Sequence, residues 1–332
     1  MSTTMLDLEN ISKRFVWKLD FAAKLANLLG AGMQERAVHA VDGVSLSVKH
    51  GEVVGLVGES GCGKSTLGRI VAGIMDVTEG SMRFEGKDIA TMSAAERRAY
   101  KLAVQMIFQD PYASLNPRMR VEDIIGEAPL AHDLIKRNEQ DAYVEAMLLQ
   151  VGLDPRYKKR FPHQFSGGQR QRIGIARALA VKPRFIVCDE AVAALDVSIQ
   201  AQVLNLFMDL REQLNLTYLF ISHNLAVVEH LSDRVVIMYL GRVVESAPTE
   251  ELFKGANHPY TQALLAEAPK LVAKRRDYTP ISGEIPSPLE PPSGCHFHPR
   301  CPHAMPRCKA EKPVLREVAP NRLSACHLND QA

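Results

Sequence analysis

The residues best suited to chemistry form a glycine-rich loop in the first quarter of the chain. The loop reads Gly58-Glu-Ser-Gly-Cys-Gly-Lys-Ser65 and matches the pattern G-x-x-x-x-G-K-[ST], with an apolar run before it and a helical pattern after it. Glycines allow successive backbone N–H groups to face phosphate oxygens, and the start of the following helix adds partial positive charge. We expect Lys64 to reach the β- and γ-phosphates and the Ser65 hydroxyl to bind Mg²⁺. The phosphate-binding residues predicted here are Gly58, Ser60, Gly61, Gly63, Lys64, Ser65 and Thr66.

Two adjacent acids end a later apolar run, Phe185-Ile-Val-Cys-Asp-Glu190. A buried strand that delivers Asp189 at its carboxyl end can hold Mg²⁺ through water, and Glu190 can accept the proton of an attacking water. Many strands end in acids, so this pattern gains weight only beside the phosphate loop.

A third segment, Phe165-Ser-Gly-Gly-Gln169, runs directly into a helical pattern that extends to Leu179. The order of phosphate loop, Ser-Gly-Gly-Gln, Asp-Glu and a later His223 resembles the ABC ATPase family. The resemblance implies that Ser166, Gly167, Gly168 and Gln169 open a helix whose N-terminus caps the γ-phosphate of ATP on the other protomer. A helix N-terminus suits an anion, so one ATP site would need two chains.

The same resemblance assigns further roles one residue at a time. Gln109 corresponds to a glutamine that contacts Mg²⁺ and the attacking water, His223 to a switch histidine near the γ-phosphate, and Asp196 to a residue of the dimer interface. For adenine stacking we choose Phe15, with Trp17 as the rival, although aromatic side chains also pack readily in a core.

The elements that must position these residues follow from hydrophobic patterning. Short β-branched runs alternate with helical patterns from Leu6 to about Ala268, which predicts a doubly wound α/β sheet. Together with the resemblance described above, this pattern implies an α/β P-loop NTPase (ABC ATPase) fold, with a nucleotide-binding domain at 1–268 and an inserted helical subdomain at about 92–180. Residues 269–332 are expected to form a Pro-rich linker and a Cys-rich module.

Four cysteines crowd into this last segment: Cys295, Cys301, Cys308 and Cys326. Without a secretion signal they are expected to be reduced, and clustered thiols then suggest a metal. Zinc is the usual choice for four cysteines, but the C-x-x-C pairs of small zinc modules are absent. The stretch Gly294-Cys-His-Phe-His-Pro-Arg-Cys-Pro302 resembles the tail of the ATP-binding subunits of bacterial oligopeptide/dipeptide importers. This resemblance implies a [4Fe–4S] cluster instead, with Zn²⁺ and unligated or histidine-assisted thiols as alternatives.

Longer stretches are similar to one branch of the family, the ATP-binding subunits of bacterial oligopeptide/dipeptide importers. These stretches are Phe165 to Arg177, Ala194 to Gln202, Phe108 to Pro117 and Gly294 to Pro302. The branch usually has Pro and Ser where Ala191 and Ala193 stand. Loss of the proline loosens the loop but removes no reacting group, so we expect ATP hydrolysis to persist at a changed rate.

The branch also implies partners: a homologous or identical second ATPase subunit, two transmembrane permease subunits and, indirectly, a periplasmic or extracellular substrate-binding protein. Residues 110–117, with Tyr112 and Leu115, are expected to offer exposed apolar groups as a socket for a permease helix. One face of an inserted helix could be formed by Trp17, Phe21, Leu25, Leu28 and Leu29. We expect this face to pack on the protein's own surface, with a membrane or partner contact as the alternative.

Composition narrows the remaining choices. A formal net charge of +2 gives no overall electrostatic signal for nucleic acid, and we expect no such partner. The sequence shows no secretion signal or membrane span, which favours a peripheral position on the cytoplasmic face of the bacterial inner membrane. The competing hypotheses are a soluble ABC ATPase for iron–sulfur assembly or nucleic-acid work, and an importer of nickel or oligosaccharide.

Overall fold

The computed structural model describes residues 4–17, 36–110, 112–267 and 283–330. The helix face predicted between residues 17 and 33 lies outside these ranges, apart from Trp17.

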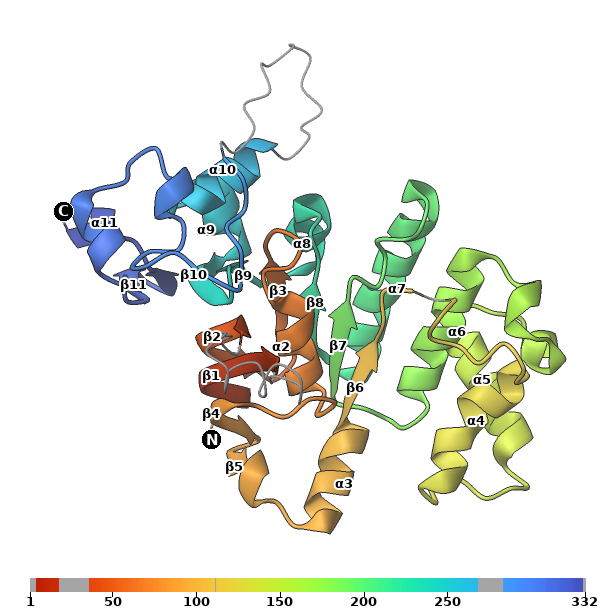
Figure 1. The fold of residues 1–332 in the computed structure, drawn as a ribbon. Coiled ribbons are helices and arrows are strands. Elements are labelled where there is room, and N and C mark those ends of the chain that lie inside the picture. The colour runs from red at the N-terminus through yellow and green to blue at the C-terminus, as the bar shows by residue number, and fades with distance from the viewer. Residues whose placement is uncertain (1–3, 18–35, 111, 268–282, 331–332) are drawn as a thin grey trace, which may run out of the picture.

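A large mixed sheet forms the centre of the described part of the chain (Figure 1). Its strand order is β11-β12-β10-β9-β3-β8-β7-β6. The bounds are β3 Val53–Val57, β6 Val104–Ile107, β7 Phe185–Asp189, β8 Thr217–Ile221, β9 Arg234–Tyr239, β10 Arg242–Pro248, β11 Arg316–Ala319 and β12 Arg322–Ser324. Strands β9, β3, β8, β7 and β6 are parallel neighbours. Their Val- and Ile-rich runs are buried because helices cover the sheet.

A second, antiparallel sheet has the order β2-β1-β4-β5. Its strands are β1 Thr4–Trp17, β2 Arg36–Lys49, β4 Glu79–Phe84 and β5 Lys87–Asp88. Its inner face shares a core with β3 and α2, which includes Leu6, Leu8, Val48 and Leu67. This contact fixes β1 and β2 next to the phosphate loop.

The helices divide between the sheet and a separate helical layer. Their bounds are α2 Lys64–Val71, α3 Ala94–Ala103, α4 Val121–Ala131, α5 Gln140–Gln150, α6 Gly167–Leu179, α7 Val197–Leu214, α8 Leu225–Leu231, α9 Thr249–Lys254, α10 Pro259–Glu267 and α11 Pro306–Ala310. Figure 1 shows α4, α5 and α6 together beyond the β6 edge of the large sheet. Within the range predicted as the helical subdomain, β6 is a strand of the large sheet.

The C-terminal segment contributes strands to the large sheet. Strand β12 pairs with β10, and β11 pairs with β12. On β10, the fully buried Glu245 accepts hydrogen bonds from the backbone N–H groups of Asn257 (2.8 Å) and His258 (2.9 Å). Arg322 of β12 donates to the same carboxylate at 3.3 Å. One buried acid thus ties together β10, the start of α10 and the C-terminal segment, because a buried charge needs such partners.

Candidate nucleotide site

The phosphate loop connects β3 to α2, as the sequence predicts. Lys64 is 4% exposed, and its Nζ donates hydrogen bonds to the carbonyl oxygens of Gly58 (2.7 Å) and Glu59 (2.9 Å). The loop therefore curls around the ammonium group, which is held at its centre. When a phosphate binds, its charged oxygen atoms would replace the two neutral carbonyl oxygens as acceptors for Lys64 Nζ. A charged acceptor binds an ammonium group more strongly than a neutral one.

Two glycines of the loop have backbone conformations that other residues rarely adopt. Gly63, which precedes α2, has φ = 103°, and Gly61 has φ = 78°. A Cβ atom at Gly63 would come within 2.0 Å of the Ala40 carbonyl oxygen in β2. Close packing of β2 on the loop thus requires glycine at this position.

Asp189 lies at the carboxyl end of β7, and the Ser65 hydroxyl donates a 2.8 Å hydrogen bond to its Oδ1. Burial raises the pKa of Asp189, and the bond from Ser65 partly opposes this shift. The pair supplies two adjacent oxygen atoms, which is the ligand chemistry that Mg²⁺ prefers. The geometry is therefore compatible with the predicted metal position.

Glu190 follows β7 directly and lies beside His223, which follows β8. His223 Nδ1 is 3.2 Å from Glu190 Oε2, and the Glu190 side chain is 16% exposed. The Glu190 N–H donates to the Ile221 carbonyl oxygen at 3.0 Å, which fixes the residue at a positive φ of 50°. The two predicted catalytic residues are thus brought together at the ends of neighbouring strands.

Gln109 lies just beyond β6 and is exposed. Because β3, β8, β7 and β6 are parallel neighbours, their carboxyl ends meet at one edge of the sheet. The loop at Gly58, the Asp189–Glu190 pair, His223 and Gln109 all follow these ends. Ligands of open α/β sheets bind at this edge.

The loop after Gln109 corrects one prediction. Tyr112 is 62% exposed, as expected, and its ring lies 3.8 Å from the Arg170 guanidinium of α6. Leu115 is only 2% exposed and belongs to the core of the helical layer, so the prediction that it is exposed is wrong. Arg177 of α6 donates to the Ser114 carbonyl oxygen at 2.5 Å and holds this segment inward.

The Ser-Gly-Gly-Gln segment begins α6 as predicted. Ser166 is the N-cap residue: Gln169 N–H donates to Ser166 Oγ at 3.4 Å, and Ser166 N–H donates to Gln169 Oε1 at 3.1 Å. Ile199 would contact a Cβ at Gly168 at 2.3 Å, so α6 packs tightly on the first turn of α7. In Figure 1 the N-terminal turn of α6 belongs to the helical layer, whereas α2 and the phosphate loop lie on the other side of β7 and β6. Within one chain the two elements that are predicted to bind phosphate are therefore separate.

Asp196 is exposed at the N-terminal end of α7, and the next residue, Val197, is 83% exposed. Ala191 is buried and Ala193 is exposed beside it. The structure does not bring Asp196 into contact with the loop at Gly58, and its interface role stays a prediction.

Phe15 and Trp17 are the exposed aromatics at the end of β1, at 39% and 63% exposure. Together with Arg14, Val16 and Val38 they line an open cavity of about 610 Å³. Phe15 pairs with Val38, two residues before Ala40, whose carbonyl oxygen faces Gly63. The predicted adenine platform thus lies on the strand pair that packs on the phosphate loop, and core packing does not explain either aromatic residue.

The four C-terminal cysteines are free thiols in one small module. Burial, with a smaller contribution from the neighbouring thiols Cys308, Cys326 and Cys301, raises the pKa of Cys295 to about 11. Among the described residues, however, no group of three or more His, Cys, Asp or Glu side chains could hold a metal ion. The structure gives no support to the predicted iron–sulfur or zinc site.

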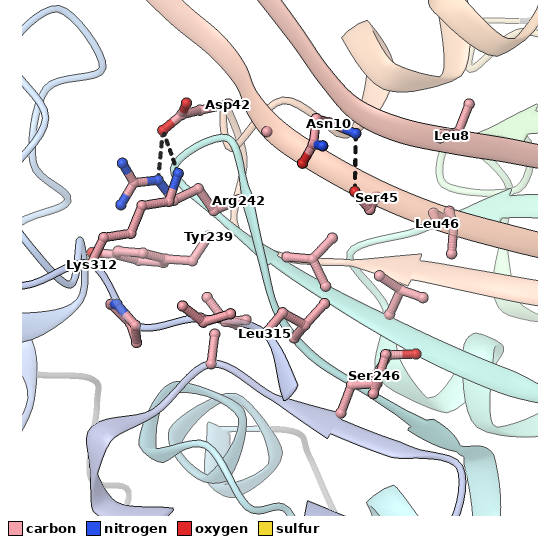
Figure 2. Close-up of a pocket in the computed structure, with 18 of the residues that line it drawn as sticks. Leu8, Asn10, Asp42, Ser45, Leu46, Tyr239, Arg242, Ser246, Lys312 and Leu315 are labelled. Atoms are coloured by element: carbon pink, nitrogen blue, oxygen red, sulfur yellow. Dashed lines mark hydrogen bonds and ion pairs between the residues drawn. The ribbon is translucent and has the colours of Figure 1, made fainter. Parts of the chain in front are cut away.

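A wider cavity of about 810 Å³ lies away from the phosphate loop, between β1, β2, β10 and the C-terminal segment (Figure 2). Figure 2 shows Asp42 paired with Arg242 at one end, where Arg242 Nε donates at 2.6 Å. Leu8, Leu46 and Leu315 form apolar walls. Cys295 of the C-terminal segment lines this cavity, but none of the predicted nucleotide-site residues does, so we do not assign the nucleotide to it.

Sequence reasoning missed one contact of the phosphate loop. Glu59 forms an ion pair with Arg300 of the C-terminal segment, at 2.8 Å. Its only signal in the sequence is a charged residue at a variable position of the loop motif.

None of the described helices is both long enough and apolar enough to cross a membrane.

Comparisons with known proteins agree with this geometry. A family model described as ABC transporter matches residues 41–193, and one described as Oligopeptide/dipeptide transporter, C-terminal region, matches residues 244–308. The oligopeptide transport ATP-binding protein AppF of Bacillus subtilis is 49% identical over 98% of this chain and 97% of its own length. The di/tripeptide transport ATP-binding protein DppF of Pseudomonas aeruginosa is 49% identical over 89% of this chain and 91% of its own.

Two solved structures share the fold. CbiO1 of Clostridium perfringens, part of the ABC transporter complex cbiONQ, has a TM-score of 0.62 at 24% identity, over 76% of this chain and 92% of its own. The ATP-binding cassette MJ0796, in a dimeric post-hydrolysis state bound to ADP and Pi, has a TM-score of 0.61 at 25% identity, over 74% of this chain and 99% of its own. These matches confirm the predicted P-loop ABC ATPase fold, whereas the Cys-rich module is not confirmed. With a phosphate loop, an Asp-Glu strand end and a Ser-Gly-Gly-Gln helix cap on this fold, and with near full-length similarity to transport ATP-binding proteins, the chain belongs to the ABC transporter family of ATP-binding subunits, in its oligopeptide/dipeptide branch.

Proposed function

We propose that this chain hydrolyses ATP to power the import of oligopeptides or dipeptides through an ABC transporter of the bacterial inner membrane. The observation that carries the proposal is the meeting of Lys64, Ser65, Asp189 and Glu190 at one edge of the parallel sheet, in a chain that also matches the C-terminal region of oligopeptide/dipeptide transporters. The relatives named above are peptide transport proteins, which favours peptides over nickel or oligosaccharides and over a soluble ABC ATPase.

The chemistry follows from the positions of the side chains. Lys64 would bind the β- and γ-phosphates, while the loop N–H groups and the N-terminus of α2 neutralise their charge. Ser65, Asp189 and Gln109 would hold Mg²⁺, which when bound neutralises charge on the transferred phosphoryl group. Glu190 would accept the proton of the attacking water, and His223, 3.2 Å away, would orient it.

The second half of the site would come from a second ATPase subunit, identical or homologous. Ser166 is exposed at the N-terminus of α6, and the partial positive charge at this end of the helix suits the γ-phosphate on a partner. Since α6 and the phosphate loop of one chain lie on opposite sides of β7 and β6, two chains arranged head to tail would complete two sites. Binding would then clamp the chains together and hydrolysis would release them.

Transport itself would belong to other proteins. Two permease subunits would dock near Tyr112, which is exposed beside Gln109 and stacks on Arg170 of α6. A substrate-binding protein outside the membrane would deliver the peptide. In this arrangement the chain lies on the cytoplasmic face of the membrane and makes no contact with nucleic acid.

The proposal is tested by uptake in cells that lack this chain. Cells are complemented with the wild-type chain or with Glu190→Gln, and the uptake of labelled dipeptide, pentapeptide, Ni²⁺ and maltotriose is compared. We expect peptide uptake to return with the wild-type chain only. Restoration of Ni²⁺ or maltotriose uptake without peptide uptake would contradict the cargo, and unchanged uptake of all four would contradict a transport role.

For the C-terminal module we propose a [4Fe–4S] cluster on Cys295, Cys301, Cys308 and Cys326, with Zn²⁺ as the alternative. What supports it is the sulfur-only donor set of four free cysteines in one short segment of the sequence. The full-length protein, purified without oxygen, should be brown and contain about four irons per chain. Colourless protein with one zinc would contradict the iron cluster, and metal-free protein with four titratable thiols would contradict both sites.

A further inference from the structure

The C-terminal module touches the phosphate loop directly, through residues far apart in the chain. Arg300 ends the short 3₁₀ helix His298–Arg300 between Cys295 and Cys301, and Glu59 is the residue after Gly58. The guanidinium donates two hydrogen bonds to the Glu59 carboxylate, NH1 to Oε2 at 2.8 Å and NH2 to Oε1 at 3.0 Å. The two residues therefore form a bidentate pair, the geometry in which Arg–carboxylate contacts are most specific.

The ion pair is largely shielded from solvent. The Arg300 side chain is 4% exposed and that of Glu59 is 19% exposed. Arg300 NH1 also donates to the Tyr239 hydroxyl at 3.4 Å. Because a guanidinium stays charged at any physiological pH, loss of Glu59 would leave a buried charge without its carboxylate, which is costly. The pair thus acts as a permanent restraint rather than a loose surface contact.

A second contact holds the main chain of the same residue. The Glu59 N–H donates to the hydroxyl of Tyr260, a fully buried residue of α10, at 3.0 Å. Phe297, three residues before Arg300, packs against both Tyr239 and Tyr260 with ring centroids 5.3 Å from each, and these two tyrosine rings lie 4.6 Å apart. Both the side chain and the amide of Glu59 are therefore held by elements that follow the family's ATPase segment in the sequence.

Glu59 in turn borders the group that would bind phosphate. Its carbonyl oxygen accepts a hydrogen bond from Lys64 Nζ at 2.9 Å. Gly58 and Gly61 flank it, and a side chain at Gly61 would meet open space. Glycine-rich backbone loses much conformational entropy when it is fixed, so a loop of this composition gains from an external restraint.

We infer that Arg300 is a positioning residue for the nucleotide site: through Glu59 it holds the phosphate loop in its binding conformation, and so makes nucleotide affinity depend on the C-terminal module. This inference rests on the proposed role of the Gly58–Ser65 loop. Arg300 would act on the nucleotide only through Glu59, because its guanidinium donates to the Glu59 carboxylate and the Tyr239 hydroxyl. Its effect is therefore expected on ATP binding and not on the chemical step.

The test measures ATP affinity and steady-state hydrolysis of the full-length chain and of Arg300→Gln, Arg300→Lys, Glu59→Gln and the double variant Glu59→Gln/Arg300→Gln. Arg300→Gln should raise Kd and KM for ATP about tenfold, as expected for one charge-assisted contact, with kcat at saturating ATP nearly unchanged. Arg300→Lys should recover part of the loss. The double variant should bind ATP no more weakly than the worse single variant, because each residue acts through the other.

The matched control is Arg307→Gln. Arg307 also pairs with acids of the C-terminal module, Glu311 and Asp330, but its side chain is 48% exposed and does not reach the loop. It should leave ATP affinity unchanged.

Two further results separate the inference from the proposed site. If Lys64→Ala abolishes ATP binding while Arg300→Gln and Glu59→Gln bind ATP normally, the inference is wrong and the site stands. If Lys64→Ala also binds ATP normally, the site assignment itself fails. If Arg300→Gln does not fold, the affinities of Glu59→Gln and Arg300→Lys decide the matter, and normal values for both would refute the inference.

Discussion

Replacement of Glu190 by Gln removes one proton acceptor and changes little else. The backbone of Glu190 is fixed by its 3.0 Å bond to the Ile221 carbonyl oxygen, and Gln has the same shape and can still face His223. Lys64, Ser65 and Asp189 keep their contacts, so ATP should bind with almost unchanged affinity. Loss of a general base should slow hydrolysis by about 10²–10⁴-fold, which corresponds to about 3–5 kcal/mol of activation free energy.

The assay must separate binding from chemistry. A single-turnover measurement of phosphate release reports hydrolysis, and equilibrium ATP titration of the same sample reports affinity. Glu229→Gln is a matched control, because Glu229 is an exposed carboxylate on the nearby helix α8. The reasoning is refuted if Glu190→Gln hydrolyses ATP as fast as Glu229→Gln does, or if it loses hydrolysis only because it no longer binds ATP.

Four further substitutions have distinct outcomes. Lys64→Ala should weaken ATP binding about tenfold or more, since a charge-assisted bond to phosphate is lost, and unchanged affinity in an ATP titration would count against its role. Tyr112→Ala should lower transport while basal ATP hydrolysis persists, and normal peptide uptake by this variant would mean that the permease docks elsewhere. Leu115→Asp should instead lower the melting temperature, because Leu115 is buried. Burial lowers the pKa of His258 to about 4 in the folded chain, whereas an unfolded histidine titrates near 6.5. As the pH falls from 6.5 to 4, the unfolded chain therefore binds a proton that the folded chain does not, and the free energy of unfolding decreases. Urea unfolding at pH 6.5 and 5 should therefore show a loss of up to about 2 kcal/mol in the wild type that is smaller in His258→Gln, and equal losses in both would contradict this assignment.

The phosphate loop and the Asp189–Glu190 pair could be predicted because their chemistry is local in the sequence. The loop needs consecutive residues of fixed type, and the acids sit at the end of a strand whose apolar run is easy to recognise. One general rule, that parallel strands end at one edge, then brings Ser65 and Asp189 to 2.8 Å although 124 residues separate them. The local sequence pattern and the fold class are together sufficient to predict the position of this part of the site.

The burial of Leu115 could not be read in the same way. The segment is rich in turn-forming and polar residues, which favours an exposed loop. Its position is instead set by α6, where Arg177 binds the Ser114 carbonyl oxygen and the side chain of Ile173 belongs to the same core. A tertiary contact of this kind overrides the local preference and leaves no periodic signal.

The strands β11 and β12 illustrate a related difficulty. They are short, four and three residues long, and lie in a segment whose prolines and cysteines suggest loops. Their stability comes from the edge of β10 and from Arg322, which reaches the buried Glu245. Edge strands that depend on a preformed sheet cannot be recognised from their own hydrophobic pattern.

The pairing of Glu59 with Arg300 marks where motif reasoning ends. A motif specifies the residues that touch phosphate and leaves Glu59 free to vary, so its charge carries no information until a partner is known. The partner lies 241 residues away, in a segment without periodic structure. The backbone of the loop nevertheless needs a restraint, because its glycines alone do not select one conformation. Glu59 is well placed to provide it, since its own carbonyl oxygen accepts a hydrogen bond from Lys64 Nζ. We therefore infer that Glu59, at a variable position of the motif, couples the Gly58–Ser65 loop to the C-terminal module. This coupling alters none of the groups that would react with ATP.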